Sequence, residues 1–123
     1  MPNRFYELHG VRVLECAEDE TRLRNDRDAV DLIGKSFENR ATVIVVPVEC
    51  LDDDFFRLRT RIAGEIVQKF VNYRRRLVIV GDISRHLEES SALRAFVNEA
   101  NRGKDVWFLA TLEELDDRLA QAV

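Results

Sequence analysis

Three short, continuous apolar runs constrain the fold of this 123-residue chain more than any other feature. They are ATVIVVPV at 41–48, LVIV at 77–80 and VWFLA at 106–110. Each run has the length of a strand and is rich in β-branched or aromatic residues. None of them alternates between polar and apolar side chains, as a strand with one solvated face would. Strands of this kind are typical of a parallel sheet that is buried on both faces.

The segments between these runs have the length and periodicity of helices. Apolar side chains recur at helical spacing over 26–37, 52–73 and 91–101, and a last helix is expected over about 111–119. Near the start of the chain, 4–8 and 11–15 read as strands that meet at His9-Gly10, a pair suited to a tight hairpin.

This order of elements predicts one α/β domain over residues 1–123. We expect an N-terminal β-hairpin followed by three βα units. Because a strand–helix–strand crossover pairs its strands in parallel, the sheet should be mixed but mostly parallel, with about five strands and four helices.

The composition excludes some classes of function. The net charge is −4, with 34% charged and 46% hydrophobic residues, so we expect neither nucleic acid nor membrane as a partner. Cys16 and Cys50 lack the spacing of a metal site, and the chain starts without the apolar segment of a signal peptide. We therefore expect a cytoplasmic protein with free thiols, no metal and no cofactor.

Arg59 is the most informative charged residue. On a continuous helix over 52–73 it would fall in the middle of the apolar face, where a charge needs a partner. Glu49 and Asp82 each directly follow a buried strand, at the sheet edge where parallel sheets bind ligands. We therefore predict that Arg59 is mostly buried and paired with Glu49 or Asp82. The group is either a structural tie or a binding site for a small anionic ligand.

A polar stripe lies on the opposite side of the same expected helix. It contains Glu65, Gln68 and Asn72. Such a stripe can be an ordinary solvated helix face. The alternative is a contact surface for a protein partner or for a second copy of the chain in a homodimer.

Several motifs resemble a known family. They are FFRLRTRIAGE at 55–65, QKFVNY at 68–73, VGD at 80–82, FVNE at 96–99 and NRG at 101–103. Together they resemble the bacterial domain-of-unknown-function family 4180, over about residues 7–119. The resemblance implies a glycine where this chain has Arg61, and it implies no activity.

The order of elements is also similar to the STAS-like fold of anti-sigma-factor antagonists. In that fold a phosphorylatable serine follows a strand and opens a helix. The matching place in this chain, residues 49–54, has no serine or threonine, so we expect no phosphoserine switch there.

No catalytic motif stands out. The chain has no GxGxxG, P-loop or HExxH pattern, and neither His9 nor His86 has a nucleophile placed beside it in the sequence. We therefore favour a non-catalytic binding or regulatory module. The alternative is a small ligand-binding domain or enzyme with its site at the C-terminal edge of the parallel strands. There Arg59 would bind the ligand, and the carboxylates of Glu49 and Asp82 could serve acid–base chemistry.

Overall fold

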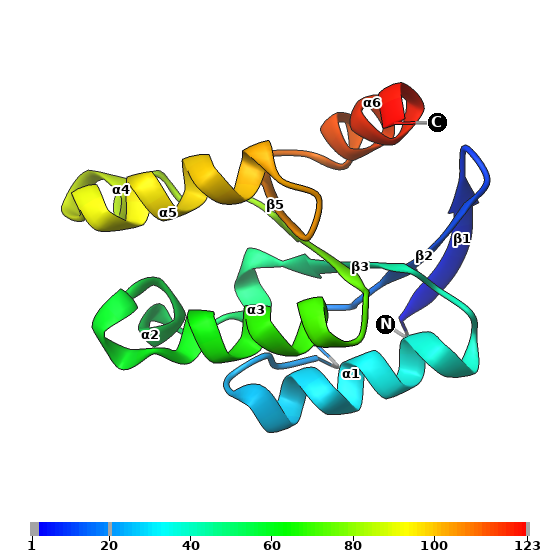
Figure 1. Ribbon diagram of the computed structural model, residues 1–123, viewed down its shortest axis with the longest axis horizontal. Coiled ribbons are helices and arrows are strands. Elements are labelled where there is room, and N and C mark those ends of the chain that lie inside the picture. The colour runs from blue at the N-terminus through cyan, green and yellow to red at the C-terminus, as the bar shows by residue number, and fades with distance from the viewer. Residues whose placement is uncertain (1–2, 20, 123) are drawn as a thin grey trace.

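The computed structural model describes residues 3–19 and 21–122 and contains a five-stranded sheet with helices packed against it (Figure 1). The strands lie side by side in the order of the chain. They are β1 (Arg4–Leu8), β2 (Val11–Glu15), β3 (Val43–Pro47), β4 (Arg76–Val80) and β5 (Val106–Leu109). β1 and β2 are antiparallel, whereas β2 through β5 are parallel. The predicted α/β fold with a mixed, mostly parallel sheet is confirmed.

The hairpin turn follows from its two residues. His9 and Gly10 both have positive φ, at 52° and 81°. Two successive residues of this kind match the twist of the flanking strands, which is why short hairpins favour glycine. The hairpin turn also contacts the last helix of the chain, because Nε2 of His9 lies 2.9 Å from a carboxylate oxygen of Asp116.

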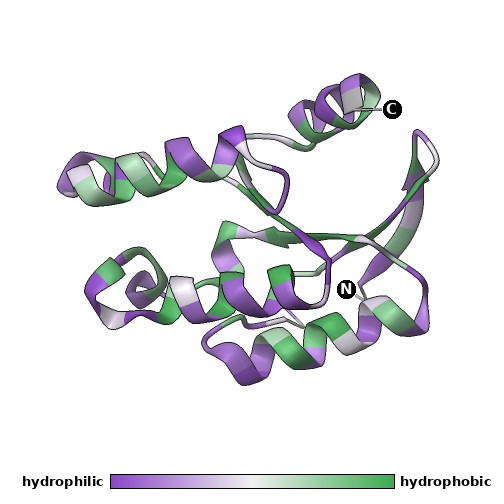
Figure 2. Cartoon of the chain, viewed as in Figure 1, coloured by the Kyte–Doolittle hydropathy of each residue, from purple (hydrophilic) through white to green (hydrophobic). Residues whose placement is uncertain are grey.

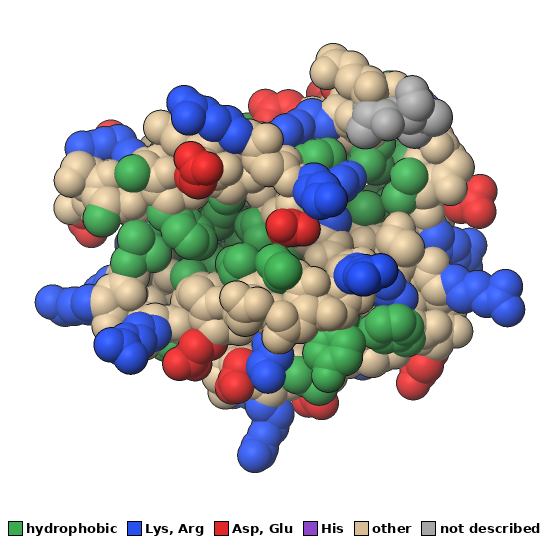
Figure 3. Space-filling view, in the orientation of Figure 1, with side chains coloured by type: hydrophobic (Ala, Val, Ile, Leu, Met, Phe, Trp, Pro, Cys, Tyr) green, Lys and Arg blue, Asp and Glu red, His purple; other side chains and the backbone are tan. Residues whose placement is uncertain are grey.

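Helices cover both faces of the sheet, which explains why the central strands are apolar throughout. The first face packs against α1 (Asp26–Glu38), α3 (Ile62–Asn72) and α5 (Ser91–Arg102). The other face packs against α6 (Leu112–Ala122) through Leu115 and Leu119. Figure 2 shows hydrophobic and hydrophilic residues alternating around these helices, as one-sided packing requires. In the same orientation, Figure 3 shows hydrophobic side chains in a hollow between the rows of atoms that correspond to α3 and α5.

The predicted helix over 52–73 is broken into three pieces. They are α2 (Asp53–Phe56), the 3-10 turn η2 (Leu58–Thr60) and α3, which begins only at Ile62. Arg61 separates the last two pieces with a left-handed backbone at φ 66°. The Thr60 hydroxyl donates to the backbone carbonyls of Asp54 and Arg57, and this bonding holds the chain in a compact corner.

The structure also adds a helix that periodicity alone did not indicate. α4 (Ser84–Glu89) follows β4. Together with the division of 52–73 into α2 and α3, it gives six α-helices among the described residues where four were expected. α4 is six residues long, about the length of one and a half turns, and is too short to show a clear apolar period. In the first buried run, β3 stops at Pro47, which has no N–H to donate to the sheet, and the 3-10 turn η1 (Val48–Cys50) follows it.

Candidate ligand-binding site

The prediction that Arg59 is mostly buried and paired with Glu49 or Asp82 is wrong. Arg59 lies in η2 and is exposed. Within residues 3–19 and 21–122 it forms no hydrogen bond or ion pair. The helical wheel assumed one continuous helix, but the left-handed residue Arg61 changes the direction of the chain, so residue 59 is no longer in phase with the buried face of α3.

Glu49 and Asp82 have other surroundings. Glu49 is exposed in η1, where its backbone carbonyl accepts a hydrogen bond of 2.6 Å from the Arg22 guanidinium. The Asp82 carboxylate accepts hydrogen bonds from the backbone N–H of Ser84, at 2.9 Å, and from the Ser84 hydroxyl. These bonds lower the pKa of Asp82 and place its carboxylate at the start of α4. Neither acid lines the cavity that contains Arg59.

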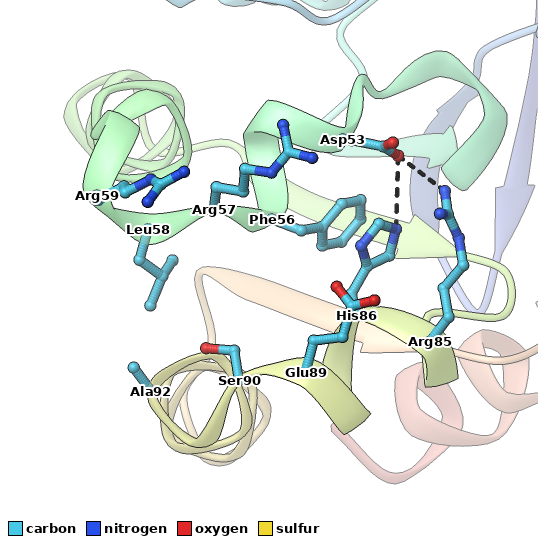
Figure 4. A pocket seen from close by; sticks show the side chains of 10 residues that line it. All are labelled: Asp53, Phe56, Arg57, Leu58, Arg59, Arg85, His86, Glu89, Ser90 and Ala92. Carbon is cyan, nitrogen blue, oxygen red and sulfur yellow. Dashed lines mark hydrogen bonds and ion pairs between the residues drawn. The ribbon is translucent and has the colours of Figure 1, made fainter.

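That cavity lies just beyond the C-terminal ends of β3 and β4, with a volume of about 400 Å³ (Figure 4). One wall comes from α2 and η2, and the other from α4 and the start of α5. The first wall consists of Asp53, Phe56, Arg57, Leu58 and Arg59. The second consists of Arg85, His86, Glu89, Ser90 and Ala92. The edge of the sheet is therefore the one predicted, although only Arg59 of the three predicted residues lines the cavity.

An aromatic stack joins the two walls. The rings of Phe56 and His86 are nearly parallel, at 12°, with their centroids 4.1 Å apart. The Asp53 carboxylate binds the Arg85 guanidinium at 2.7 Å and lies 3.9 Å from Nε2 of His86. The His86 side chain is only 10% exposed, and this burial is the main cause that lowers its pKa. The stack and the ion pair hold α4 against α2, and they do so without Arg59.

The three arginines of the cavity differ in what they bind. Arg85 is paired with Asp53, and Arg57 is paired with Asp54 at 2.8 Å. Arg59 has no such partner in the described part of the chain, and Figure 4 shows its guanidinium on the same side of η2 as that of Arg57. Ser90, which caps α5 by accepting from Leu93 N–H, sits on the opposite wall. The arrangement can offer N–H donors to an anion, but it has no nucleophile paired with a base.

Sequence reasoning did not identify Asp53, Phe56, Arg85 and His86 as members of one site. One signal was available, because 81–84 directly follows a buried strand and therefore lies at the same edge as the residues after β3. The stack between residues 56 and 86 requires that α4 exist, and α4 was not expected. The predicted stripe of Glu65, Gln68 and Asn72 is exposed on α3, and Gln68 donates a hydrogen bond of 2.8 Å to Asn72.

The start of α3 has a hydroxyl residue that lies outside the segment considered in the sequence. The expectation of no phosphoserine switch concerned residues 49–54, which contain no serine or threonine, and α2 begins within that segment. α3 begins at Ile62. The backbone N–H of Ile62 donates a hydrogen bond of 3.3 Å to the Thr60 hydroxyl. A hydroxyl residue therefore does lie at the opening of the main helix.

The described residues contain no group of three His, Cys, Asp or Glu side chains placed to hold a metal ion. In the same part of the chain, no helix has the length and apolar character needed to cross a bilayer.

Fold and site together define an α/β domain with successive helix–strand units and an arginine-lined cavity at the C-terminal edge of its parallel strands. The chain belongs to the family described as Domain of unknown function (DUF4180), whose model matches residues 8–119. The resemblance seen in the motifs is thereby confirmed at the level of the family, and its function is not known. No curated protein and no solved structure matches the chain.

Proposed function

We propose that this protein is a non-catalytic binding module that holds a small anionic ligand in the cavity between α2 and α4. The observation that carries the proposal is that the guanidinium of Arg59 is unpaired within the described residues. It lines the cavity without a protein partner among the described residues, whereas Arg57 and Arg85 are engaged by aspartates. A guanidinium presents a planar fork of N–H donors that fits a carboxylate or a phosphate.

The lining favours an anion with one charge and an apolar body. Three arginines and two acidic residues line the cavity, so it carries a formal excess of one positive charge when His86 is neutral. Phe56, Leu58 and Ala92 supply apolar surface beside these charges. Ligand sites commonly combine an apolar wall with a few polar groups that orient the ligand. A monocarboxylate with a hydrocarbon body fits this lining better than a small, multiply charged anion.

The test is a thermal-shift and calorimetric titration with benzoate, and with inorganic phosphate for comparison. We expect benzoate to raise the melting temperature, because a ligand at 100 times its Kd adds about 2.7 kcal/mol to the free energy of unfolding. The variant Arg59→Gln should lose this shift. Arg27→Gln, an exposed arginine on α1 outside the cavity, is the matched control and should retain it. Equal binding by both variants, or no binding by the unmodified protein, would overturn the proposal.

The biological setting is part of the same proposal. We infer a bacterial, cytoplasmic regulatory protein with a STAS-like order of elements. The support is the N-terminal hairpin followed by repeated helix–strand units, together with two buried cysteines that are both free thiols. Free thiols are the usual state in a reducing compartment.

A further inference from the structure

An apolar groove runs between α3 and α5, on the side of the molecule formed by α1, α3 and α5. It has a volume of about 230 Å³, and we call it the α3–α5 groove. Val67 and Val71 line it from α3, and Phe96 and Ala100 line it from α5. Two acidic residues, Glu99 and Asp105, lie at its border. Figure 3 shows hydrophobic side chains in this hollow, with acidic side chains at its border and basic side chains close to them. An open apolar groove with a charged border is typical of an interaction surface.

An exposed aromatic pair lies on the same side of the molecule, at the C-terminal ends of α1 and α3. The rings of Phe37 and Tyr73 meet edge to face, with centroids 6.2 Å apart. Phe37 is 49% exposed and Tyr73 is 46% exposed. The guanidinium carbon of Arg75 lies 3.8 Å from the centre of the Phe37 ring, and Arg74 is exposed beside it. We call this feature the Phe37–Tyr73 ridge; it is apolar with a basic border.

Exposed large apolar residues are concentrated on this side of the protein. Among the described residues, five large apolar side chains are exposed. Four of the five lie on α1, on α3 or at the C-cap position of α3. They are Val30, Phe37, Val71 and Tyr73, with Leu112 of α6 as the fifth. The groove lies between α3 and α5, and the ridge joins the C-terminal ends of α1 and α3, so the two features flank the C-terminal part of α3 on the same side of the molecule (Figure 1).

We propose that this surface joins two copies of the chain in a symmetric homodimer, with the Phe37–Tyr73 ridge of each copy in the α3–α5 groove of the other. A two-fold interface must be self-complementary, because each contact occurs twice with the roles exchanged. This surface meets that requirement. The groove is apolar with acidic residues at its border, and the ridge is apolar with basic residues at its border. A two-fold axis near Val71 would place the ridge of each copy in the groove of the other.

The charges at the two borders are free to make such contacts. Glu99 has only a distant ion pair of 4.0 Å with Arg102, and both side chains are more than 80% exposed. Arg74 forms no ion pair within residues 3–19 and 21–122. In the dimer, Arg74 of one copy faces Glu99 of the other. Gln68 and Asn72, which belong to the predicted contact stripe, lie near the axis on the outer side of α3.

Sedimentation velocity of the full chain over a range of concentrations tests the dimer. We expect a concentration-dependent monomer–dimer equilibrium for the unmodified protein, with the dimer dominant at about 300 µM. Val71→Asp should make the protein monomeric, because it places a charge at the apolar centre of the interface. Leu112→Asp is the matched control. It is an exposed apolar residue, at 39%, on the helix that packs against the other face of the sheet, and it should leave the equilibrium unchanged.

Charge reversal makes the test specific and does not depend on how well Val71→Asp folds. Arg74→Glu alone and Glu99→Arg alone should each weaken the dimer by about tenfold or more, since like charges would then face each other. The double variant Arg74→Glu/Glu99→Arg should restore it. A protein that stays monomeric at about 300 µM, or a double variant no better than the single ones, would overturn the proposal. These substitutions leave the cavity residues untouched, so benzoate binding is an independent readout.

Discussion

At the scale of single residues, Arg61 has the largest effect on the shape of the site. Its left-handed backbone, at φ 66° and ψ 3°, ends η2 and allows α3 to start in a new direction. A residue with a Cβ pays a steric cost in this conformation, and glycine does not. Glycine is therefore the residue that this backbone conformation favours.

Arg61→Gly should therefore stabilise the protein. We expect a gain of about 1 kcal/mol in the free energy of unfolding, because the left-handed conformation costs a non-glycine residue about 1–2 kcal/mol and the greater flexibility of unfolded glycine offsets part of it. Urea denaturation measures the change. Arg57→Gly, at an ordinary φ of −93°, is the matched control and should give no gain. A loss of stability in Arg61→Gly would contradict this account.

His86 should make the stability depend on pH. Burial against Phe56 holds the pKa of His86 below its usual 6.5, so the unfolded chain takes up a proton here before the folded protein does. The contribution of His86 to the free energy of unfolding is thus full above pH 6.5. It falls as the pH is lowered through 6.5 towards the depressed pKa of the folded state.

His86→Phe removes this titration while keeping an aromatic ring against Phe56. We expect the variant to lose less stability than the unmodified protein between about pH 7.5 and pH 5, measured by urea denaturation. His9→Asn, in the exposed hairpin turn, is the control and should keep the steeper dependence. Identical slopes for the unmodified protein and His86→Phe would show that burial does not control this histidine.

At the scale of elements, the turn between β4 and α4 positions one wall of the cavity. Gly81 has φ 143°, in the range that favours glycine, and a Cβ at this position would lie 2.7 Å from Cγ2 and 2.9 Å from Cβ of Val48. Val48 belongs to η1, which follows β3. The close approach of residues 48 and 81 therefore brings the ends of β3 and β4 together, and with them α2 and α4.

Gly81→Ala should destabilise the protein by about 3 kcal/mol, because backbone strain and overpacking each cost about 1–3 kcal/mol. Gly34→Ala is the matched control. A Cβ at Gly34 would meet nothing within 4 Å in the middle of α1, and alanine should stabilise this helix by about 1 kcal/mol. Chemical denaturation of the two variants should therefore give changes of opposite sign. A Gly81→Ala variant as stable as the unmodified protein would mean that the turn adjusts without cost.

At the scale of the whole molecule, both cysteines lie in the part of the core that the sheet forms with α1, α3 and α5. Cys16 follows β2 and Cys50 ends η1, and both are free thiols at 2% and 0% exposure. Burial is the main cause that raises the pKa of Cys16 to about 12 and that of Cys50 to about 11. Since the thiolate is the reactive form, neither thiol should react in the folded protein.

A disulfide-exchange reagent that absorbs light on reaction can check this expectation. In the folded protein at about pH 8, both thiols should react only as fast as the molecule opens. In denaturant without a reducing agent, two thiols should react at once. Finding no free thiol in the denatured protein would refute the prediction of reduced cysteines, and immediate reaction in the folded state would contradict their burial.

The sequence by itself determined which segments form the sheet and the main helices. Local patterns of polarity and backbone preference marked the runs at 41–48, 77–80 and 106–110, the His9-Gly10 turn and the helical periods of 26–37 and 91–101. Such patterns follow from the repeat of strand and helix, and they imply parallel pairing once strands and helices alternate. The sheet edge that holds the cavity could be predicted for the same reason.

Only the tertiary structure decided which side chains meet at that edge. The break at Arg61 moved Arg59 out of the core and left it unpaired within the described residues, and no apolar period marks such a break. The stack of Phe56 on His86 joins residues 30 positions apart in the sequence, through a helix too short to be recognised by its pattern. Contacts of this kind depend on how turns such as the one at Gly81 orient separate elements, and local periodicity carries no information about that orientation.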